Sequence, residues 1–284
     1  MNADVFERVL GQRPTRIEPL GGGAAGTVVR LHLPEGGTLV AKQAPAGLEV
    51  EAVSLRLLAE RSSLPVPRVV HAEATLLVMQ DMPGRTGAGQ AQAHAADLLA
   101  ALHAVTSPDG RYGLDFDNTI GPLPQTNGWA DDWPTFFAHR RLLPLAHAAA
   151  REGSLAPRIA GRLEHLASRL GEFLPATPPA SLLHGDLWSG NILSDGPRVT
   201  GLIDPSPYFG HAEVELAFIR LFSTLGPTFE LAYREQRGVP DVDWREFERT
   251  RCALYNLYPL LVHTRLFGGH YAQDLESSLT SLGL

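Results

Sequence analysis

Alternating apolar and polar positions in the first third of the chain predict short β-strands. Residues 27–33 alternate and are rich in β-branched side chains, a turn follows at 34–37, and residues 38–42 return as a second strand. Two further short strands are expected at 68–72 and 75–79. The pattern therefore predicts a small antiparallel sheet in this part of the chain.

Helical spacing interrupts these strands once and then dominates the rest of the chain. Residues 48–60 predict a helix whose apolar side is supplied by Val50, Val53, Leu55, Leu57 and Leu58. Further helices are expected at 95–103, from Asp131 onward with Phe136 and Phe137 inward, at 155–173 and at 253–262. We therefore expect an α+β fold whose larger, C-terminal part is mainly helical.

The segment Gln80-Asp81-Met82-Pro83-Gly84 separates the two patterns and is typical of a linker. We expect an N-terminal lobe at 1–82, with an antiparallel sheet and one helix, and a C-terminal lobe at 83–284. No internal repeat is apparent along the chain.

Composition indicates an ordinary globular protein and excludes several classes of function. The 284 residues are 44% hydrophobic and 19% charged, and the net charge of −7 argues against a nucleic-acid partner. The first residues lack the pattern of a signal peptide, and no apolar run has the roughly 20 residues that a membrane span needs. Cys252 is the single cysteine, so a disulfide within the chain is impossible. We expect a cytoplasmic protein with no membrane contact and no obligate protein partner.

One residue count suggests a site. Of the 24 Lys and Arg residues only Lys42 is lysine, although the rest of the sequence favours arginine. An ammonium is a compact point charge, whereas a guanidinium is wide and planar. Lys42 therefore indicates a position where arginine cannot replace lysine. The alternative is that one surface lysine persisted by chance.

Glycines before the first predicted hairpin strand are candidates for a phosphate cradle. Gly21, Gly22, Gly23 and Gly26 lie directly before residues 27–33, and glycine lets backbone N–H groups approach phosphate oxygens. The spacing is not that of a Walker loop, because no Gly-Lys-Ser/Thr follows. An ordinary turn between strands is the competing interpretation.

Lys42 ends the returning strand in Val40-Ala41-Lys42, and the next predicted helix carries Glu51 in its first turn. In kinases a helix glutamate pairs with such a strand lysine, which holds the nucleotide phosphates. Glu49 is the competitor, and favourable interaction with the helix dipole is the structural alternative. In the linker, Gln80 and Met82 are the candidates to offer backbone groups to an adenine.

The segment from Ser181 to Asp204 contains the set of groups that phosphoryl transfer needs. Two apolar strands surround a polar loop with Asp186 and Asn191, and a turn at 194–197 brings the chain back to Asp204. Asp186 is expected to be the catalytic base, and Asn191 and Asp204 are expected to hold Mg²⁺ on the phosphates of ATP. The spacing matches the kinase pattern His-x-Asp-x-x-x-x-Asn, in which His184 is expected to shape the loop.

These residues resemble the fructosamine kinase (ketosamine-3-kinase) family, relatives of aminoglycoside and choline kinases. The resemblance rests on Leu183-His184-Gly185-Asp186-Leu187-Trp188-Ser189-Gly190-Asn191 and on Ile203-Asp204-Pro205, followed by 208–211. It extends to residues 112–113, 118–121, 124–127, 132–133 and 213–217. Its most specific element is Trp188-Ser189, where aminoglycoside and choline kinases typically carry His-Pro. The fold implied is the two-lobed fold of protein kinases.

The resemblance also implies roles. It assigns Asp186 as base, Asn191 and Asp204 as metal ligands, and Lys42 with Glu51 as the phosphate-holding pair. Trp188 and His263 fall where family members contact the sugar; internal packing is the alternative for both. Ala24 replaces a cysteine of many eukaryotic members, and residues 261–265 are less polar than in vertebrate relatives.

The leading hypothesis is an ATP- and Mg²⁺-dependent kinase that phosphorylates a sugar hydroxyl, O3, of a ketosamine such as fructosamine or ribulosamine, with a role in deglycation repair. Alternatives are a kinase of another small molecule, of aminoglycoside or choline type, and a nucleotide-binding pseudokinase. Protein kinase activity is not expected, because Pro205-Ser206 follows Asp204 where protein kinases have Phe-Gly.

Overall fold

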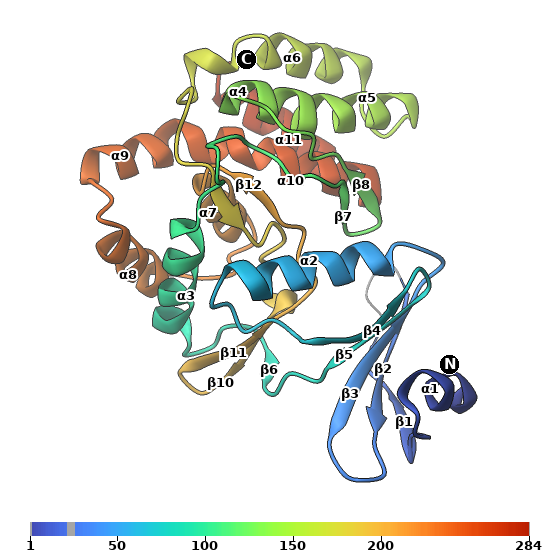
Figure 1. Cartoon of the computed structure of the whole chain (residues 1–284). Helices are drawn as coiled ribbons and strands as arrows, with labels where there is room; N and C mark the ends of the chain where they lie inside the picture. The colour runs from blue at the N-terminus through green and yellow to red at the C-terminus, as the bar shows by residue number, and fades with distance from the viewer. Residues whose placement is uncertain (1, 22–25, 284) are drawn as a thin grey trace.

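The computed structural model describes residues 2–21 and 26–283, and its N-terminal part is built on one antiparallel sheet (Figure 1). The strands lie in the order β1 (Arg16–Pro19), β2 (Thr27–His32), β3 (Thr38–Gln43), β5 (Leu76–Gln80) and β4 (Val69–Glu73). All neighbouring strands run antiparallel. The four strands predicted from the sequence are therefore confirmed, with ends shifted by about one residue.

The two faces of this sheet are covered by different helices. Helix α1 (Ala3–Leu10) packs Phe6 into a small cluster with alternate residues of the strands, including Leu31 and Val78. On the other side, α2 (Leu48–Arg61) buries Leu55 and Leu58 in the main core. The helix prediction at 48–60 is confirmed, but Val53 was wrongly placed on the apolar side, because its side chain faces solvent and is 42% exposed.

The C-terminal part is mainly helical, as expected. Its helices are α3 (Gln92–Ala104), α4 (Trp133–Phe136), α5 (Leu143–Arg151), α6 (Pro157–Ala167), α7 (Glu213–Leu221), α8 (Pro227–Arg237), α9 (Asp241–Glu246), α10 (Cys252–Phe267) and α11 (His270–Ser281). Single π-helical segments at 137–142 and 247–251 lead into α5 and α10. None of the helices in the described residues is long and apolar enough to cross a membrane.

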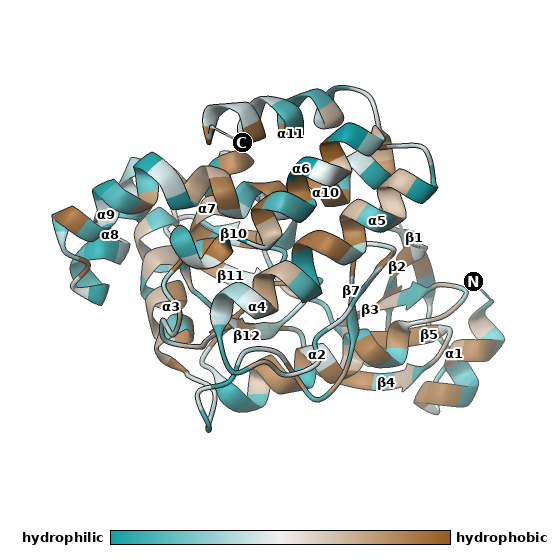
Figure 2. Cartoon of the chain, turned by 90° about the horizontal axis from the view of Figure 1, so that it is seen from above, coloured by the Kyte–Doolittle hydropathy of each residue, from teal (hydrophilic) through white to brown (hydrophobic). Residues whose placement is uncertain are grey.

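Two predicted helices in this part had wrong boundaries. The helix expected over 155–173 begins at Pro157, whose fixed φ suits a first helical position, and ends at Ala167 before a 3₁₀ turn at 170–172. Helix α10 continues past the expected end at residue 262 and reaches Phe267, where Gly268 takes φ 61°. Most of its circumference is buried, and it lies among the other C-terminal helices (Figure 2).

Three small sheets complete the C-terminal part and position its polar loops. β6 (Arg85–Thr86) pairs with the hairpin of β10 (Ile192–Asp195) and β11 (Arg198–Leu202). β9 (Ser181–Leu183) pairs with β12 (Tyr208–Gly210), and β7 (Asn118–Ile120) pairs with β8 (Leu123–Gln125). The loops after β9 and after β11 are therefore held next to one another.

Candidate active site

A cavity of about 790 Å³ lies between the five-stranded sheet, α2 and the C-terminal part. The predicted residues that line it are Gly21, Gly26, Lys42, Glu51, Gln80, Met82, Asp186, Trp188, Asn191, Asp204 and His263. Gly22 and Gly23 lie outside the described residues. His184 is fully buried beneath the loop instead of lining the cavity. The structure thus places the predicted residues in and under one cavity.

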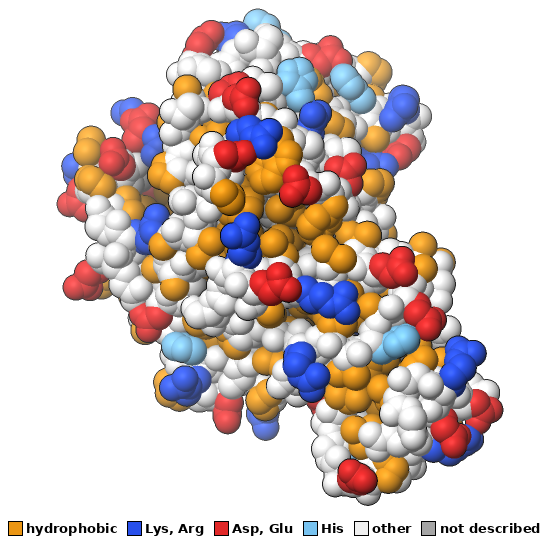
Figure 3. Space-filling model, viewed as in Figure 1, with side chains coloured by type: hydrophobic (Ala, Val, Ile, Leu, Met, Phe, Trp, Pro, Cys, Tyr) orange, Lys and Arg blue, Asp and Glu red, His pale blue; other side chains and the backbone are white. Residues whose placement is uncertain are grey.

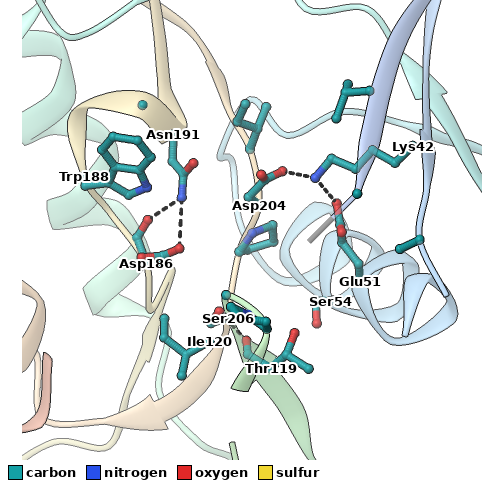
Figure 4. Close-up of a pocket in the computed structure, with 18 of the residues that line it drawn as sticks. Lys42, Glu51, Ser54, Thr119, Ile120, Asp186, Trp188, Asn191, Asp204 and Ser206 are labelled. Atoms are coloured by element: carbon teal, nitrogen blue, oxygen red, sulfur yellow. Dashed lines mark hydrogen bonds and ion pairs between the residues drawn. The ribbon is translucent and has the colours of Figure 1, made fainter. Parts of the chain in front are cut away.

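Lys42 lies between two carboxylates that come from different parts of the chain (Figure 4). Because side chains alternate along β3, Ala41 points into the small cluster under α1 and Lys42 points into the cavity. Its Nζ donates to Glu51 Oε1 at 2.6 Å and also to Asp204 Oδ1. Burial opposes the charge of Lys42, but the two carboxylates outweigh burial and raise its pKa. Lys42 is therefore a cation held at one defined point.

The choice between Glu49 and Glu51 as partner of Lys42 follows from helix geometry. Both lie in the first turn of α2, but residues two apart on a helix do not share a face. The structure pairs Glu51 with Lys42, while Glu49 is exposed on the helix surface. The pairing expected from the sequence is therefore present.

The loop after β9 requires a glycine and carries Asp186. Gly185 has φ 85°, and a Cβ there would lie 2.0 Å from the carbonyl oxygen of Ser206. Ser206 N–H also donates to His184 O at 2.8 Å, so the two loops are in direct contact. This close approach of the two backbones holds Asp186 near the segment that contains Asp204.

Asp186 and Asn191 are joined by a short 3₁₀ turn at Ser189–Asn191. Asn191 Nδ2 donates to the backbone oxygen of Asp186 at 2.8 Å and to its carboxylate Oδ2 at 3.2 Å. Burial raises the pKa of Asp186 to about 7, and the nearby charge of Asp204 adds to the effect. A carboxylate with such a pKa is suited to accept a proton near neutral pH.

Asn191 and Asp204 form a donor set that suits Mg²⁺. Asn191 uses its amide nitrogen for Asp186, and its Oδ1 accepts no hydrogen bond from the described residues. Asp204 binds Lys42 through Oδ1, so its second oxygen remains for a cation. The described residues contain no cluster of three His, Cys, Asp or Glu side chains that would hold a metal alone. Mg²⁺ in kinases takes its other ligands from substrate phosphates and waters.

The backbone of Asp204 is in an uncommon conformation. Its φ is 54°, a left-handed value that it shares with one other described non-glycine residue, Ser223. Aspartate tolerates this region better than most residues, at a cost of roughly 1–3 kcal/mol. The conformation turns the chain at the end of β11, where Ile203 N–H donates to Asn191 O at 3.0 Å.

His184 is buried directly beneath the catalytic loop. Its Nδ1 lies 3.4 Å from the backbone nitrogen of Asp186 and accepts from that N–H. Its Nε2 has no hydrogen-bond partner among the described residues. Burial lowers the pKa of His184, so the ring is neutral at neutral pH. The geometry is consistent with the loop-shaping role expected for it.

Glu215 on α7 is a site residue that the sequence reasoning missed. It is 3% exposed, and it accepts from the N–H groups of Gly185 at 2.7 Å and His184 at 3.3 Å. It also contacts His103 Nε2 at 2.9 Å. Burial opposes its charge, but these partners outweigh burial and lower its pKa. An acid inside the otherwise apolar run from Val214 to Phe218 was the signal that could have identified it.

Trp188 and His263 also line the cavity. Trp188 is 48% exposed and its ring covers Gly190, where a Cβ would lie 2.3 Å from the indole. His263 belongs to α10, which corrects the expectation that it follows the helix. Its Nδ1 donates to Pro259 O at 2.8 Å, which leaves Nε2 as an acceptor. Burial lowers the pKa of His263, so the ring is neutral.

Comparison with proteins of known sequence identifies the family of the chain. The sequence model described as fructosamine kinase matches residues 3–283. "Probable ketoamine kinase YniA" of Escherichia coli K12 is 36% identical over 246 residues, which cover 83% of this chain and 80% of that protein. "Probable ketoamine kinase slr1563" of Synechocystis is 36% identical over 239 residues, covering 81% and 77%.

Solved structures agree with this relationship. A protein from Thermobifida fusca that carries the name fructosamine-3-kinase superposes with a TM-score of 0.87 at 29% identity, covering 99% of this chain and 97% of that chain. The aminoglycoside phosphotransferase APH(4)-Ia has a TM-score of 0.68 at 18% identity over 98% of both chains, which confirms the two-lobed protein-kinase-like fold. The chain is a small-molecule kinase and belongs to the fructosamine kinase family.

Proposed function

We propose that this protein transfers the γ-phosphate of ATP to a sugar hydroxyl, O3, of a ketosamine such as fructosamine or ribulosamine. The observation that carries the proposal is that Lys42, Asp186, Asn191 and Asp204 line one cavity together with Trp188. The names of the related proteins, ketoamine kinases, support the substrate class.

The nucleotide is proposed to bind at the end of the cavity under the five-stranded sheet. Lys42 would bind its phosphates while Glu51 orients the lysine, and Gly21 and Gly26 lie where a phosphate cradle is expected. Gln80 and Met82, at the connection between residues 80 and 85, would offer backbone groups to the adenine. The division of the chain into lobes at 1–82 and 83–284 is part of this proposal.

Asn191 and Asp204 would hold Mg²⁺ through an amide oxygen and a carboxylate oxygen. The ion would neutralise charge on the phosphates as the phosphoryl group is transferred. Asp186 would accept the proton of the attacking hydroxyl, a role that its pKa of about 7 suits. Glu215 and His184 would keep this loop in place from below.

The acceptor is proposed to lie between Trp188 and His263. An indole face suits the apolar side of a sugar and attracts an amine cation by roughly 0.5–2 kcal/mol. The neutral His263 ring presents Nε2 as an acceptor for a hydroxyl or an N–H group. Release of amines from their sugar adducts, a form of repair, is the proposed purpose of the reaction.

Charge on the surface supports a small-molecule acceptor more than a nucleic acid. Basic and acidic side chains are interspersed over the face shown in Figure 3, without a broad basic area. The net charge of −7 points the same way. A cytoplasmic location and the absence of an obligate protein partner remain expectations.

Mass spectrometry and NMR of fructose-lysine and ribulose-lysine after incubation with enzyme and Mg·ATP would test the proposal. We expect a gain of one phosphate on the third carbon of the sugar, and no product with Asp186→Ala. Transfer only to aminoglycosides or choline would support the alternative kinase, whereas ATP binding without any transfer would support the pseudokinase.

A further inference from the structure

One part of the cavity is lined by aromatic and apolar side chains that contact one another. We call it the aromatic subsite, and it consists of Phe218, Phe222, Val262, His263, Phe267 and Tyr271. These residues come from three helices: from α7 and the residue that follows it, from α10, and from the first turn of α11. The His263 ring is central, with centroids 4.8 Å from Phe222 and 4.9 Å from Tyr271.

Charged side chains lie elsewhere in the cavity. Its charged lining residues are Arg30, Lys42, Glu51, Asp81, Asp186 and Asp204. Arg30 pairs with Asp81 at 2.6 Å near the proposed adenine site, and Lys42 is held by its two carboxylates. Among the described residues, therefore, no cation lines the aromatic subsite. Arg265, on the same helix, pairs with Glu152 and does not line the cavity.

This distribution of charge discriminates between possible nitrogen substituents of a ketosamine. The protonated nitrogen itself would be favoured by the Asp186 carboxylate and the Trp188 indole. A carboxylate on the substituent would lose water without gaining a cation, and it would share the cavity with the charge of Asp186. An apolar or aromatic substituent would bury its surface against rings at no such cost.

We infer that the aromatic subsite binds the nitrogen substituent of the ketosamine and selects apolar or aromatic amines without a carboxylate over free amino acids. Glycated aralkyl amines and lysine side chains inside peptides have this chemistry. The inference rests on the proposed function, in which His263 Nε2 faces the sugar, and it assigns the rings around His263 to the part of the substrate beyond the sugar.

A matched set of substrates tests the selection. Fructosyl-phenethylamine and fructosyl-phenylalanine differ by the carboxylate, and fructosyl-phenylalaninamide replaces it with a neutral group of similar size. We expect kcat/KM to be about tenfold or more higher for the amine and the amide than for the acid, and higher for phenethylamine than for ethylamine. Equal or better turnover of the acid would overturn the inference.

A variant can shift this selection in a known direction. Phe267 is 62% exposed in the last turn of α10, so Phe267→Arg adds a cation that the structure tolerates. We expect the ratio of kcat/KM for the amide to kcat/KM for the acid to fall by roughly twofold to fivefold. Leu231→Arg is the matched control, because Leu231 on α8 is 68% exposed and does not line the cavity. If this ratio is the same in Phe267→Arg and Leu231→Arg, the proposed role of the aromatic subsite is wrong.

With this set of substrates, failure of the proposed function and failure of this inference alone give different results. If no fructosyl amine in the set is phosphorylated, both the ketosamine assignment and this inference are overturned. If the amines are phosphorylated but the acid is preferred, the ketosamine assignment stands and only the role of the aromatic subsite is wrong.

Discussion

Lys42 occupies a position that suits an ammonium and not a guanidinium. Its Nζ is shared by Glu51 and Asp204, which come from opposite sides of the cavity. The planar fork of arginine would place its nitrogens at different points while keeping the charge. We predict that Lys42→Arg lowers kcat/KM by about 100-fold, since misplacement by about 1 Å has effects of that size.

Steady-state kinetics with a ketosamine and Mg·ATP would measure this loss. Arg249→Lys is the control, because Arg249 has a side chain that is 75% exposed and its conservative exchange is expected to leave the rate unchanged. Wild-type kcat/KM in Lys42→Arg would mean that the single lysine of the chain has no special role.

The pKa of Asp186 predicts how kcat/KM depends on pH. Burial, with the charge of Asp204 added, raises its pKa to about 7, and only the deprotonated carboxylate can accept the hydroxyl proton. We predict that kcat/KM for the ketosamine decreases on the acid side, with a midpoint near or below pH 7 because bound Mg²⁺ offsets the charge of Asp204. A rate that is constant from pH 5 to pH 8 would contradict this assignment of the base.

Local sequence was enough to predict which residues meet in the site. Asn191 and Asp204 lie at the open end of the β10–β11 hairpin, and Asp186 precedes Asn191 by five residues in the loop after β9, so their proximity follows from strand and turn patterns. Glu215 could not be found in this way, because it reaches the loop from α7 through tertiary packing. The apolar residues on both sides of Glu215 indicate that it is buried, but they do not reveal which backbone groups it binds.

At the scale of elements, α7 supports the catalytic loop from below. Glu215 accepts two backbone N–H groups of that loop and contacts His103. We predict that Glu215→Gln lowers kcat by about tenfold or more while KM for ATP changes little, because the amide presents an N–H where an acceptor is needed. The free energy of unfolding should also decrease by about 1–3 kcal/mol.

Glu213→Gln separates the two effects. Glu213 lies on the same helix and pairs with Arg251 at 2.6 Å, away from the catalytic loop. We expect it to lower thermal stability without changing kcat of the folded enzyme. If Glu215→Gln also changed only stability, α7 would be a structural support and nothing more.

Helix ends were the elements that sequence patterns predicted least well. The apolar run to Val262 gave no reason to extend α10 to Phe267, because residues 263–267 mix polar and apolar side chains. Tertiary contacts with α7 and α11 continue the helix, and only then does His263 join the aromatic subsite. Its neighbours Phe222 and Tyr271 come from other helices, so no local pattern could have revealed the pocket.

At the scale of the whole molecule, one ion pair joins the N-terminal sheet to the C-terminal part across the cavity. Lys42 on β3 contacts Asp204, which follows β11. The two-lobed fold was predictable because its catalytic motifs are local and specific. The pairing of Lys42 with Asp204 was not predictable, because the motif assigns Lys42 to phosphates and Asp204 to a metal and does not indicate that the two side chains contact each other.

Binding of Mg·ATP should exchange this ion pair for contacts of Lys42 to phosphate and of Asp204 to the metal. At 100 times the Kd a ligand adds about 2.7 kcal/mol to the free energy of unfolding, which for this chain length is roughly 5 °C in Tm. We predict that ATP with Mg²⁺ raises Tm by about that much, and that ATP with EDTA has a smaller effect. In Asp204→Ala the difference between the two conditions should disappear.

The Asp195→Ala variant is the control for Asp204→Ala in this measurement of Tm. Asp195 ends β10 in the same hairpin as Asn191, is exposed and does not line the cavity, so its loss removes one acid without touching the proposed metal site. The Mg²⁺-dependent increase in Tm should persist there and vanish in Asp204→Ala. If both variants kept it, Asp204 would not be a metal ligand. If both lost it, general loss of negative charge near the cavity, and not ligation by Asp204, would explain the effect of magnesium.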